Sequence, residues 1–418
     1  MSLVEQLVRF IPEVVSPTQK KVSFKVKLKW TLTTLILFFV LGFIPLLGLG
    51  QNALSQFEYL SIILGAKFGS ILSLGIGPLV TSSIVLQLLN GSGLVKFDTH
   101  TPEGKRKFQS TQKLLSIFFI VFEAFVYVLM GGLAPATPGI AIKLLLVAQL
   151  IIGGLLIMLM DEVITKWGFG SGISLFIAAG VSESLFIRMF SPLRADGGLG
   201  GFVGAIPEFF RLLTIQDASG AALALWGVIA TVLIFLVAVY AQAMKVEIPL
   251  SFGRVRGHGI RWPLSFLYTS NIPVILIAAL LANIQLWARL LQNWGYPILG
   301  TFVGNQPASG LVAWLTPTHI VQAIVTGTFS FTTLLHSLVY ISIFVVGSVI
   351  FSIFWVQTSG MDARSQAKNI LASGLQMPGF RKDARVLEQI LDRYIGPLTV
   401  MGGTSIGLLA SLADLLGA

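Results

Sequence analysis

Long runs of apolar residues, separated by short polar and basic stretches, dominate the chain. A helix that crosses a bilayer needs about 20 largely apolar residues, and nine runs come close to that length. The pattern therefore predicts nine membrane-spanning helices, over residues 28–49, 70–89, 114–130, 140–160, 171–190, 221–243, 267–291, 331–356 and 395–416.

Two further segments are apolar but do not fit a span. Residues 53–68 are too short and too polar to cross, yet too apolar for a free loop. They predict a short helix that dips into the protein, because irregular structure at membrane depth has to be buried. Residues 1–14 mix Glu5, Arg9 and Glu13 with apolar side chains. That mixture indicates an amphipathic helix lying on the membrane rather than a cleavable signal.

Composition supports the membrane assignment. Only 11% of the residues are charged and 55% are hydrophobic, whereas a soluble domain carries about 25% charged residues. That excludes an ordinary soluble enzyme and a disordered chain. Cysteine is absent, the four histidines form no H-x-x-x-H pair, and no G-x-x-x-x-G-K-[ST] phosphate loop occurs. We therefore expect a passive conduit or a secondary transporter, without a metal or cofactor.

The distribution of positive charge predicts the orientation. With the N-terminus in the cytoplasm, 22 of the 28 lysines and arginines fall in cytoplasmic segments and six on the outer side. Such a bias indicates a cytoplasmic N-terminus. Two long basic loops, 245–261 and 364–393, stand out. They could attract an anionic partner such as lipid head groups, an acidic protein or RNA, or they could serve only to fix the topology.

Glu123 is the clear ionisable residue inside a predicted span. A charge near mid-membrane is expensive, so Glu123 is either functional, facing water or the bundle interior, or a structural residue hydrogen-bonded between helices. Ion-coupled transporters usually carry several such residues, so a single one gives that class little support. Glycine and proline interrupt three spans, which suggests helices that face protein or a cavity, although both are common in membrane helices: Gly75, Gly77, Pro78, Gly168, Gly170, Gly172 and Pro273.

Five long stretches resemble the SecY family, whose members are the large subunits of protein-conducting translocation channels. The stretches occur in the family's order over nearly the whole chain, and the first is closest to archaeal and eukaryotic members. They are GIGPLVTSSIVLQLLNGSG (75–93), KWGFGSGISLFIAAGVS (166–182), VEIPLSFGRVRG (246–257), YTSNIPVILIAALLANIQL (268–286) and GFRKDARVLEQILDRYIGPLTVMGG (379–403).

The resemblance implies an all-α, polytopic helix bundle whose two pseudo-symmetric halves surround an hourglass pore. Residues 1–190 would form one half, with the interfacial helix, spans one to five and a plug half-helix at about 53–68. Residues 191–418 would form the other, with spans six to nine and cytoplasmic docking loops at 244–262 and 358–394. The family has ten spans, so we expect the sequence to lack the tenth, which would supply a sixth residue of the pore ring.

The resemblance also assigns roles to individual residues. A ring of aliphatic side chains narrows the pore, and two of its pairs are spaced i, i+4 on one helix face. From sequence alone such pairs would usually pack or face lipid. The ring residues are Ile76, Val80, Ile173, Ile177 and Ile275; the lateral gate residues are Thr81, Glu123 and Asn283; the plug residues are Phe57, Glu58, Tyr59, Leu60, Ile62, Ile63 and Lys67; and the docking residues are Arg254, Arg256, Arg381, Lys382, Arg385 and Arg393.

The function implied is a passive channel in the cell membrane, not an enzyme. Unfolded polypeptides, including secretory proteins with signal sequences, would cross through the ring, and hydrophobic segments of membrane proteins would leave sideways into lipid. The implied partners are the SecE/gamma subunit, a second small membrane subunit, and the ribosome or a motor ATPase. A secondary transporter of a small solute is the alternative, supported by the broken helices and Glu123. A scaffold subunit without a pore is a third possibility.

Overall fold

The computed structural model describes most of the chain and divides it into two compact units. The first unit comprises Met1–Leu86, Lys107–Ile187 and Ala279–Ala313, and the second comprises Gln87–Arg106, Arg188–Ala278 and Trp314–Ala418. Among the described residues, seven helices are long and apolar enough to cross a membrane. The described residues are 13–18, 22–52, 66–91, 94–95, 97, 101–194, 201–252, 259–303, 306–373, 375–376 and 383–418.

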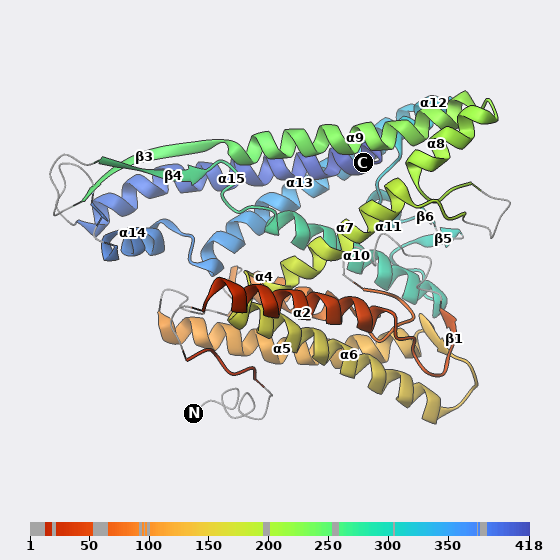
Figure 1. The fold of residues 1–418 in the computed structure, drawn as a ribbon, viewed down its shortest axis with the longest axis horizontal. Helices are drawn as coiled ribbons and strands as arrows, with labels where there is room; N and C mark the ends of the chain where they lie inside the picture. Colours follow the sequence, from red (N-terminus) through yellow and green to blue (C-terminus); the bar gives the residue numbers. More distant parts are fainter. Residues whose placement is uncertain are drawn as a thin grey trace. The chain divides into compact units, whose positions relative to one another are not determined.

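The first unit is built mainly of long helices (Figure 1). Helix α2 packs along α6. Two small antiparallel pairs, β1 with β2 and β5 with β6, close the connections between helices. In chain order the elements of this unit, five of which extend into the second unit, are α2 (Phe24–Gly42), β1 (Leu49–Asn52), α4 (Gly77–Gly91), α5 (Pro102–Leu129), β2 (Leu133–Pro135), α6 (Ile140–Trp167), α7 (Gly172–Phe190), α10 (Ile272–Asn293), β5 (Thr301–Val303), β6 (Gln306–Ser309) and α11 (Leu311–Trp314).

Two predicted spans differ from the helices observed. The first was expected over 28–49, but α2 ends at Gly42 and the chain then pairs with the stretch before α4: Leu46 N donates to Gly69 O at 2.9 Å. Pro45 lies three residues beyond the end of α2, and it disfavours continuation of the helix because the residue before a proline avoids helical geometry. The second was expected over 70–89, but α4 begins only at Gly77. Pro78 then occupies the first turn of the helix, where a missing N–H does no harm.

The second unit combines a helical bundle with a small sheet. Helices α13 and α15 approach closely through small residues: a Cβ on Gly403 would lie 2.6 Å from Ser352 Oγ. Small residues permit such close packing between membrane helices. Besides parts of α4, α5, α7, α10 and α11, the unit contains α8 (Ala205–Thr214), α9 (Ala218–Ala243), β3 (Lys245–Phe252), β4 (Gly259–Ser265), α12 (Ile320–Val325), α13 (Phe331–Ser359), α14 (Ala363–Ala372), β7 (Leu375–Gln376) and α15 (Ala384–Leu416).

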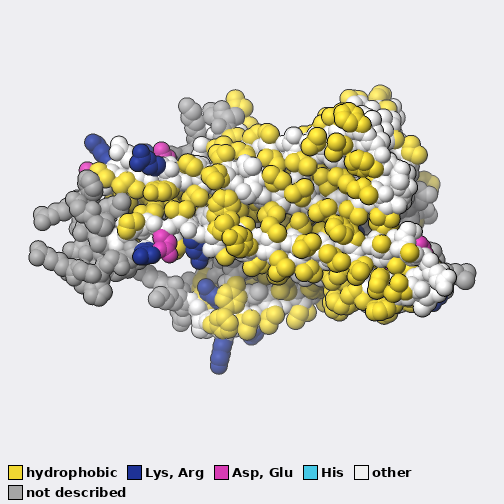
Figure 2. Space-filling model, turned by 90° about the horizontal axis from the view of Figure 1, so that it is seen from above, with side chains coloured by type: hydrophobic (Ala, Val, Ile, Leu, Met, Phe, Trp, Pro, Cys, Tyr) yellow, Lys and Arg dark blue, Asp and Glu magenta, His cyan; other side chains and the backbone are white. Residues whose placement is uncertain are grey.

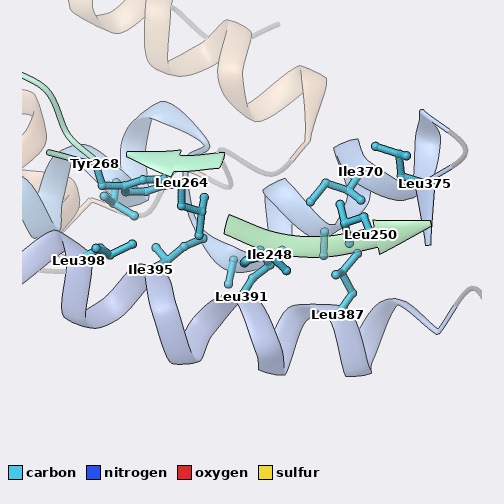
Figure 3. Packing of buried hydrophobic residues seen from close by; sticks show 13 residues of the cluster. Ile248, Leu250, Leu264, Tyr268, Ile370, Leu375, Leu387, Leu391, Ile395 and Leu398 are labelled. Atoms are coloured by element: carbon cyan, nitrogen blue, oxygen red, sulfur yellow. The ribbon is translucent and has the colours of Figure 1, made fainter. Parts of the chain in front are cut away.

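The two predicted basic loops fold together. Strand β3 pairs antiparallel with β4 along its whole length and with β7 at its end, where Ser251 lies opposite Gln376. Ile248, Leu250 and Leu264 pack against α14 and the first half of α15, as Figure 3 shows. We call β3, β4, β7, α14 and the first half of α15 the sheet–helix module. Its strands were not predicted, since both segments were taken as loops.

Exposed side chains on the long helices are predominantly apolar. Helix α9 leaves Phe235, Leu236 and Tyr240 more than half exposed. Figure 2 shows a face on which hydrophobic side chains predominate and few charged ones interrupt them. An apolar surface of this extent suits contact with lipid rather than water.

Candidate functional site

Three polar side chains from three helices meet inside the first unit. Asn283 Nδ2 on α10 donates a hydrogen bond to Thr81 Oγ1 on α4 at 3.2 Å. Thr81 Oγ1 lies 3.3 Å from Glu123 Oε1 on α5 and 2.9 Å from the carbonyl oxygen of Gly77. Glu123 and Asn283 are only 5% and 8% exposed. The structure thus brings together the three residues expected at the lateral gate, which we call the polar cluster.

The polar cluster is incompletely satisfied. Within the described part of the chain, Glu123 Oε2 and the Tyr127 hydroxyl are buried without a hydrogen-bond partner. Tyr127 lies one turn beyond Glu123 on α5. Buried polar groups are normally paired, and an unpaired one costs free energy. The cluster therefore holds α4, α5 and α10 together less firmly than a fully paired network would.

The structure confirms the one-turn spacing of the two predicted ring pairs. Ile76 and Val80 are buried at the start of α4, and Val80 N donates to Ile76 O at 3.0 Å. Ile173 and Ile177 lie half-buried on the first turns of α7. Ile275 is half-buried on the first turns of α10, in the second unit. That these five side chains form one ring stays a prediction.

A tight junction between α6 and α7 sets the position of the second ring pair. Asp161 Oδ1 accepts a hydrogen bond from Ile173 N at 2.9 Å, so a carboxylate near the end of α6 caps the start of α7. A Cβ on Gly172 would lie 2.6 Å from Asp161 Cα. Glycine is therefore required at this close approach, and Ile173 follows it directly.

Lys67, the one described residue of the predicted plug, is held by three neighbours in the first unit. Its Nζ lies 2.9 Å from Glu183 Oε1 on α7 and 4.7 Å and 5.5 Å from the ring centroids of Phe43 and Phe39. A cation is attracted to both a carboxylate and an aromatic face. The other predicted plug residues lie outside the described residues: Phe57, Glu58, Tyr59, Leu60, Ile62 and Ile63.

Glu183 was missed at the sequence level. It lies inside a predicted span, and an acidic residue there is unusual enough to have been singled out beside Glu123. Its partner, Lys67, comes from the far end of the re-entrant segment. An acid in one apolar segment and a base at the end of another is the signal that could have found the pair.

Two of the six predicted docking residues lie on the sheet–helix module. Arg385 and Arg393 are exposed on α15. Asp383 Oδ1 accepts a hydrogen bond from Arg385 N at 2.9 Å and so caps the start of this helix. The other four docking residues lie outside the described residues: Arg254, Arg256, Arg381 and Lys382. Their segments follow β3 and β7 directly, and these two strands pair. Both basic segments therefore leave from adjacent strands of one sheet.

Tyr268 fastens the module to the start of α10. Its hydroxyl donates to the carbonyl oxygen of Met361, between α13 and α14, at 2.6 Å. Burial raises the pKa of the Tyr268 hydroxyl to about 12, so it remains a donor at neutral pH. The hydrogen bond joins segments that lie far apart in the sequence, and it fixes the orientation of the module on its helices.

These observations define a class of protein. The chain is a polytopic α-helical membrane protein with a polar cluster where three of its helices meet and a folded sheet–helix module. Within the described residues, no group of three or more histidine, aspartate or glutamate side chains is arranged to hold a metal ion.

Comparison with known proteins identifies the family. The SecY family model matches residues 70–418. The chain is 44% identical to protein translocase subunit SecY of Methanothermobacter thermautotrophicus, over 99% of this chain and 90% of that one. It is 40% identical to protein translocase subunit SecY of Methanocaldococcus jannaschii, over 98% of this chain and 89% of that one. The chain belongs to the SecY family.

Solved structures of similar fold agree with this assignment. A protein-conducting channel matches with a TM-score of 0.83 and 38% identity, covering 100% of this chain and 92% of that one. Sec61 from the canine ribosome–channel complex of the endoplasmic reticulum matches with a TM-score of 0.80 and 37% identity, with the same coverage. These neighbours do not support the alternative of a small-solute transporter.

Proposed function

We propose that this chain is the channel-forming subunit of a protein translocation complex in the cell membrane. It conducts unfolded polypeptides across the bilayer and releases hydrophobic segments sideways into lipid. The observation that carries the proposal is similarity to protein-conducting channels over the whole chain, at 38% identity and a TM-score of 0.83. The polar cluster adds support, because it lies where three helices meet.

The conducting path is closed by an aliphatic collar of Ile76, Val80, Ile173, Ile177 and Ile275. A narrow apolar constriction dewets and so blocks ions. It offers no fixed hydrogen-bond partner to a polypeptide sliding through it. Isoleucine and valine are stiff at χ1, which suits a seal that closes again after each substrate. Residues around 57–67 form the plug that covers the collar at rest.

The lateral exit opens where α4 and α5 separate from α10. Opening breaks the hydrogen bond from Asn283 to Thr81, and it is favoured when a hydrophobic segment gains more by entering lipid than the closed contacts provide. Interhelical hydrogen bonds in membranes are worth roughly 0.6 to 2 kcal/mol each. The polar cluster therefore sets a modest threshold that a sufficiently apolar segment can exceed.

The chain acts without chemistry of its own, and its energy comes from partners. The N-terminus lies in the cytoplasm, so the sheet–helix module faces the ribosome or a motor ATPase, while a SecE/gamma subunit and a second small subunit complete the complex. Arg254, Arg256, Arg381, Lys382, Arg385 and Arg393 bind the docking partner. Where the partner is ribosomal RNA, phosphate contacts make affinity fall steeply with salt.

Ion conductance tests the channel directly. The complex with all five collar residues replaced by glycine, reconstituted in a planar bilayer, is expected to leak ions at rest far more than the wild-type complex. The matched control carries glycine at Ile152 and Ile350, isoleucines exposed on α6 and α13. Equal conductance of the two variants would contradict the collar assignment.

A further inference from the structure

Two aromatic rings join α5 to α10 beside the polar cluster. The rings of Phe122 and Trp287 are stacked, with centroids 5.7 Å apart and an interplanar angle of 27°. Phe122 directly precedes Glu123, and Trp287 lies one turn beyond Asn283. Phe122 is 39% exposed, whereas Glu123 is only 5% exposed. The stack therefore lies toward the outside of the bundle, and the polar cluster lies inside it.

The stack completes a set of pairwise contacts among three helices. Thr81 connects α4 to α5 through Glu123 and to α10 through Asn283. The contact between Phe122 and Trp287 is the third contact, and it joins α5 directly to α10. A segment that moves out between α5 and α10 has to separate these two rings.

We infer that Phe122 and Trp287 form an aromatic clasp that sets how hydrophobic a segment must be to leave the channel sideways. The inference rests on the proposed function, since it assumes that segments pass between these helices. The two residues act as specificity-determining residues, and the substrate feature they select is the apolar character of a transmembrane segment.

The physical basis lies in what lipid can and cannot replace. When the rings separate, lipid chains restore their general apolar contacts, because lipid is as apolar as the side chains. Lipid does not restore the preferred geometry between two aromatic quadrupoles. An aromatic pair of this kind changes an equilibrium about two- to tenfold. Apolar side chains of the exiting segment offset that loss, and polar ones do not.

The test uses a reporter protein with a graded series of test segments of about 20 leucine and alanine residues. Membrane vesicles carrying the full complex are assayed for the fraction of each segment that enters lipid. Trp287→Ala and Phe122→Ala are each expected to shift the leucine content at which half of the segments integrate toward fewer leucines. Near the wild-type midpoint, the ratio of integrated to non-integrated segment should rise about two- to tenfold. Trp287→Phe keeps a ring and is expected to restore most of the wild-type threshold.

Phe125→Ala is the matched control. Phe125 lies on the same helix and is also 39% exposed, and its ring makes no contact with another ring of the described chain. The double variant Phe122→Ala/Trp287→Ala is expected to match the single variants, because either change removes the same contact. A shift no larger than that of Phe125→Ala, or additive shifts in the double variant, would overturn the clasp.

The assay separates this inference from the proposed function. Wild-type vesicles that integrate no test segment at any leucine content would overturn the lateral exit itself. Wild-type vesicles with a clear midpoint that both single variants retain would overturn only the clasp. Recovery of each variant complex in wild-type amounts excludes loss of folding as the cause of a shift.

Discussion

The sheet–helix module and the polar cluster hold their elements together by opposite means. The module buries a continuous apolar core that includes Ile248, Leu387 and Leu391, each no more than 2% exposed. That core is stabilised by removal of apolar surface from water, at about 25 cal/mol per Å². The polar cluster lies among helices that lipid solvates equally well when they are apart, so only its few polar and aromatic contacts resist separation. The contrast teaches that this chain is rigid in the module proposed to dock a partner and separable at the proposed lateral exit.

The largest loss in the free energy of unfolding is expected from a change in the core of the sheet–helix module. Leu391→Ala removes a side chain that is 1% exposed, and a buried Leu→Ala change costs about 2–5 kcal/mol. Leu408→Ala makes the same change on the same helix at a residue that is 39% exposed, with an expected effect within about 0.5 kcal/mol. Chemical unfolding in detergent micelles measures both. Similar losses for the two variants would remove the contrast between the module and the spans.

An intermediate effect is expected in the polar cluster. Thr81→Val keeps the shape of the side chain and removes the hydroxyl that connects α4 to α5 and α10. The free energy of unfolding should fall by about 0.6–2 kcal/mol. Thr34→Val is the control, because the buried Thr34 hydroxyl donates only to Trp30 O of its own helix. If Thr34→Val costs as much as Thr81→Val, the contacts between helices add nothing.

The smallest effect on stability is expected at a contact that lies partly open to water, between Arg211 and Glu208. Hydrogen bonds from Arg211 and from the Phe202 amide lower the pKa of Glu208 below its usual 4.5. Because the folded-state pKa is depressed, the contribution of Glu208 is present above the unfolded pKa and is lost as the pH falls through the folded one. Hydrogen-exchange protection of the Phe202 amide should weaken as the solution is acidified below pH 4.5. In the Arg211→Gln variant, the loss of protection at the Phe202 amide should be shallower and should begin at a higher pH. An identical profile in the variant would show that the ion pair is irrelevant.

The sequence predicted most of the long helices because length and apolar character alone specify a membrane helix. Helices α6 and α13, for example, contain the largely apolar runs predicted over 140–160 and 331–356. Residues 43–48 and 70–76 were placed in helices wrongly, because their apolar side chains fit a span while their backbones pair with each other around Pro45. Strand β3 was missed because Pro249 stands in its middle, and proline within a run argues against a strand.

The candidate site was predictable only as far as the resemblance reached. Thr81 and Asn283 lie in stretches that resemble the family, Glu123 stood out as an ionisable residue inside a predicted span, and the structure brings the three together. The stack of Phe122 on Trp287 could not be predicted, because it joins segments whose neighbourhood depends on how helices pack. The ion pair of Lys67 with Glu183 left only an indirect signal in the sequence, an acid in one apolar segment and a base at the end of another. A periodic pattern gives the face of a helix on which a residue lies, and it does not give the residue opposite.

The pairing of β3 with β7 has a consequence for the order in which the chain matures. An isolated two-stranded hairpin is marginally stable in water, so β3 and β4 emerge from synthesis as an unfinished element. Helices α10, α13 and α14 have to be made before Gln376 can reach Ser251, and closing so long a loop is slow. A nascent chain that has not yet reached β7 and α15 therefore lacks a finished module, and the youngest copies in the membrane cannot compete with mature ones for the partner proposed to dock there.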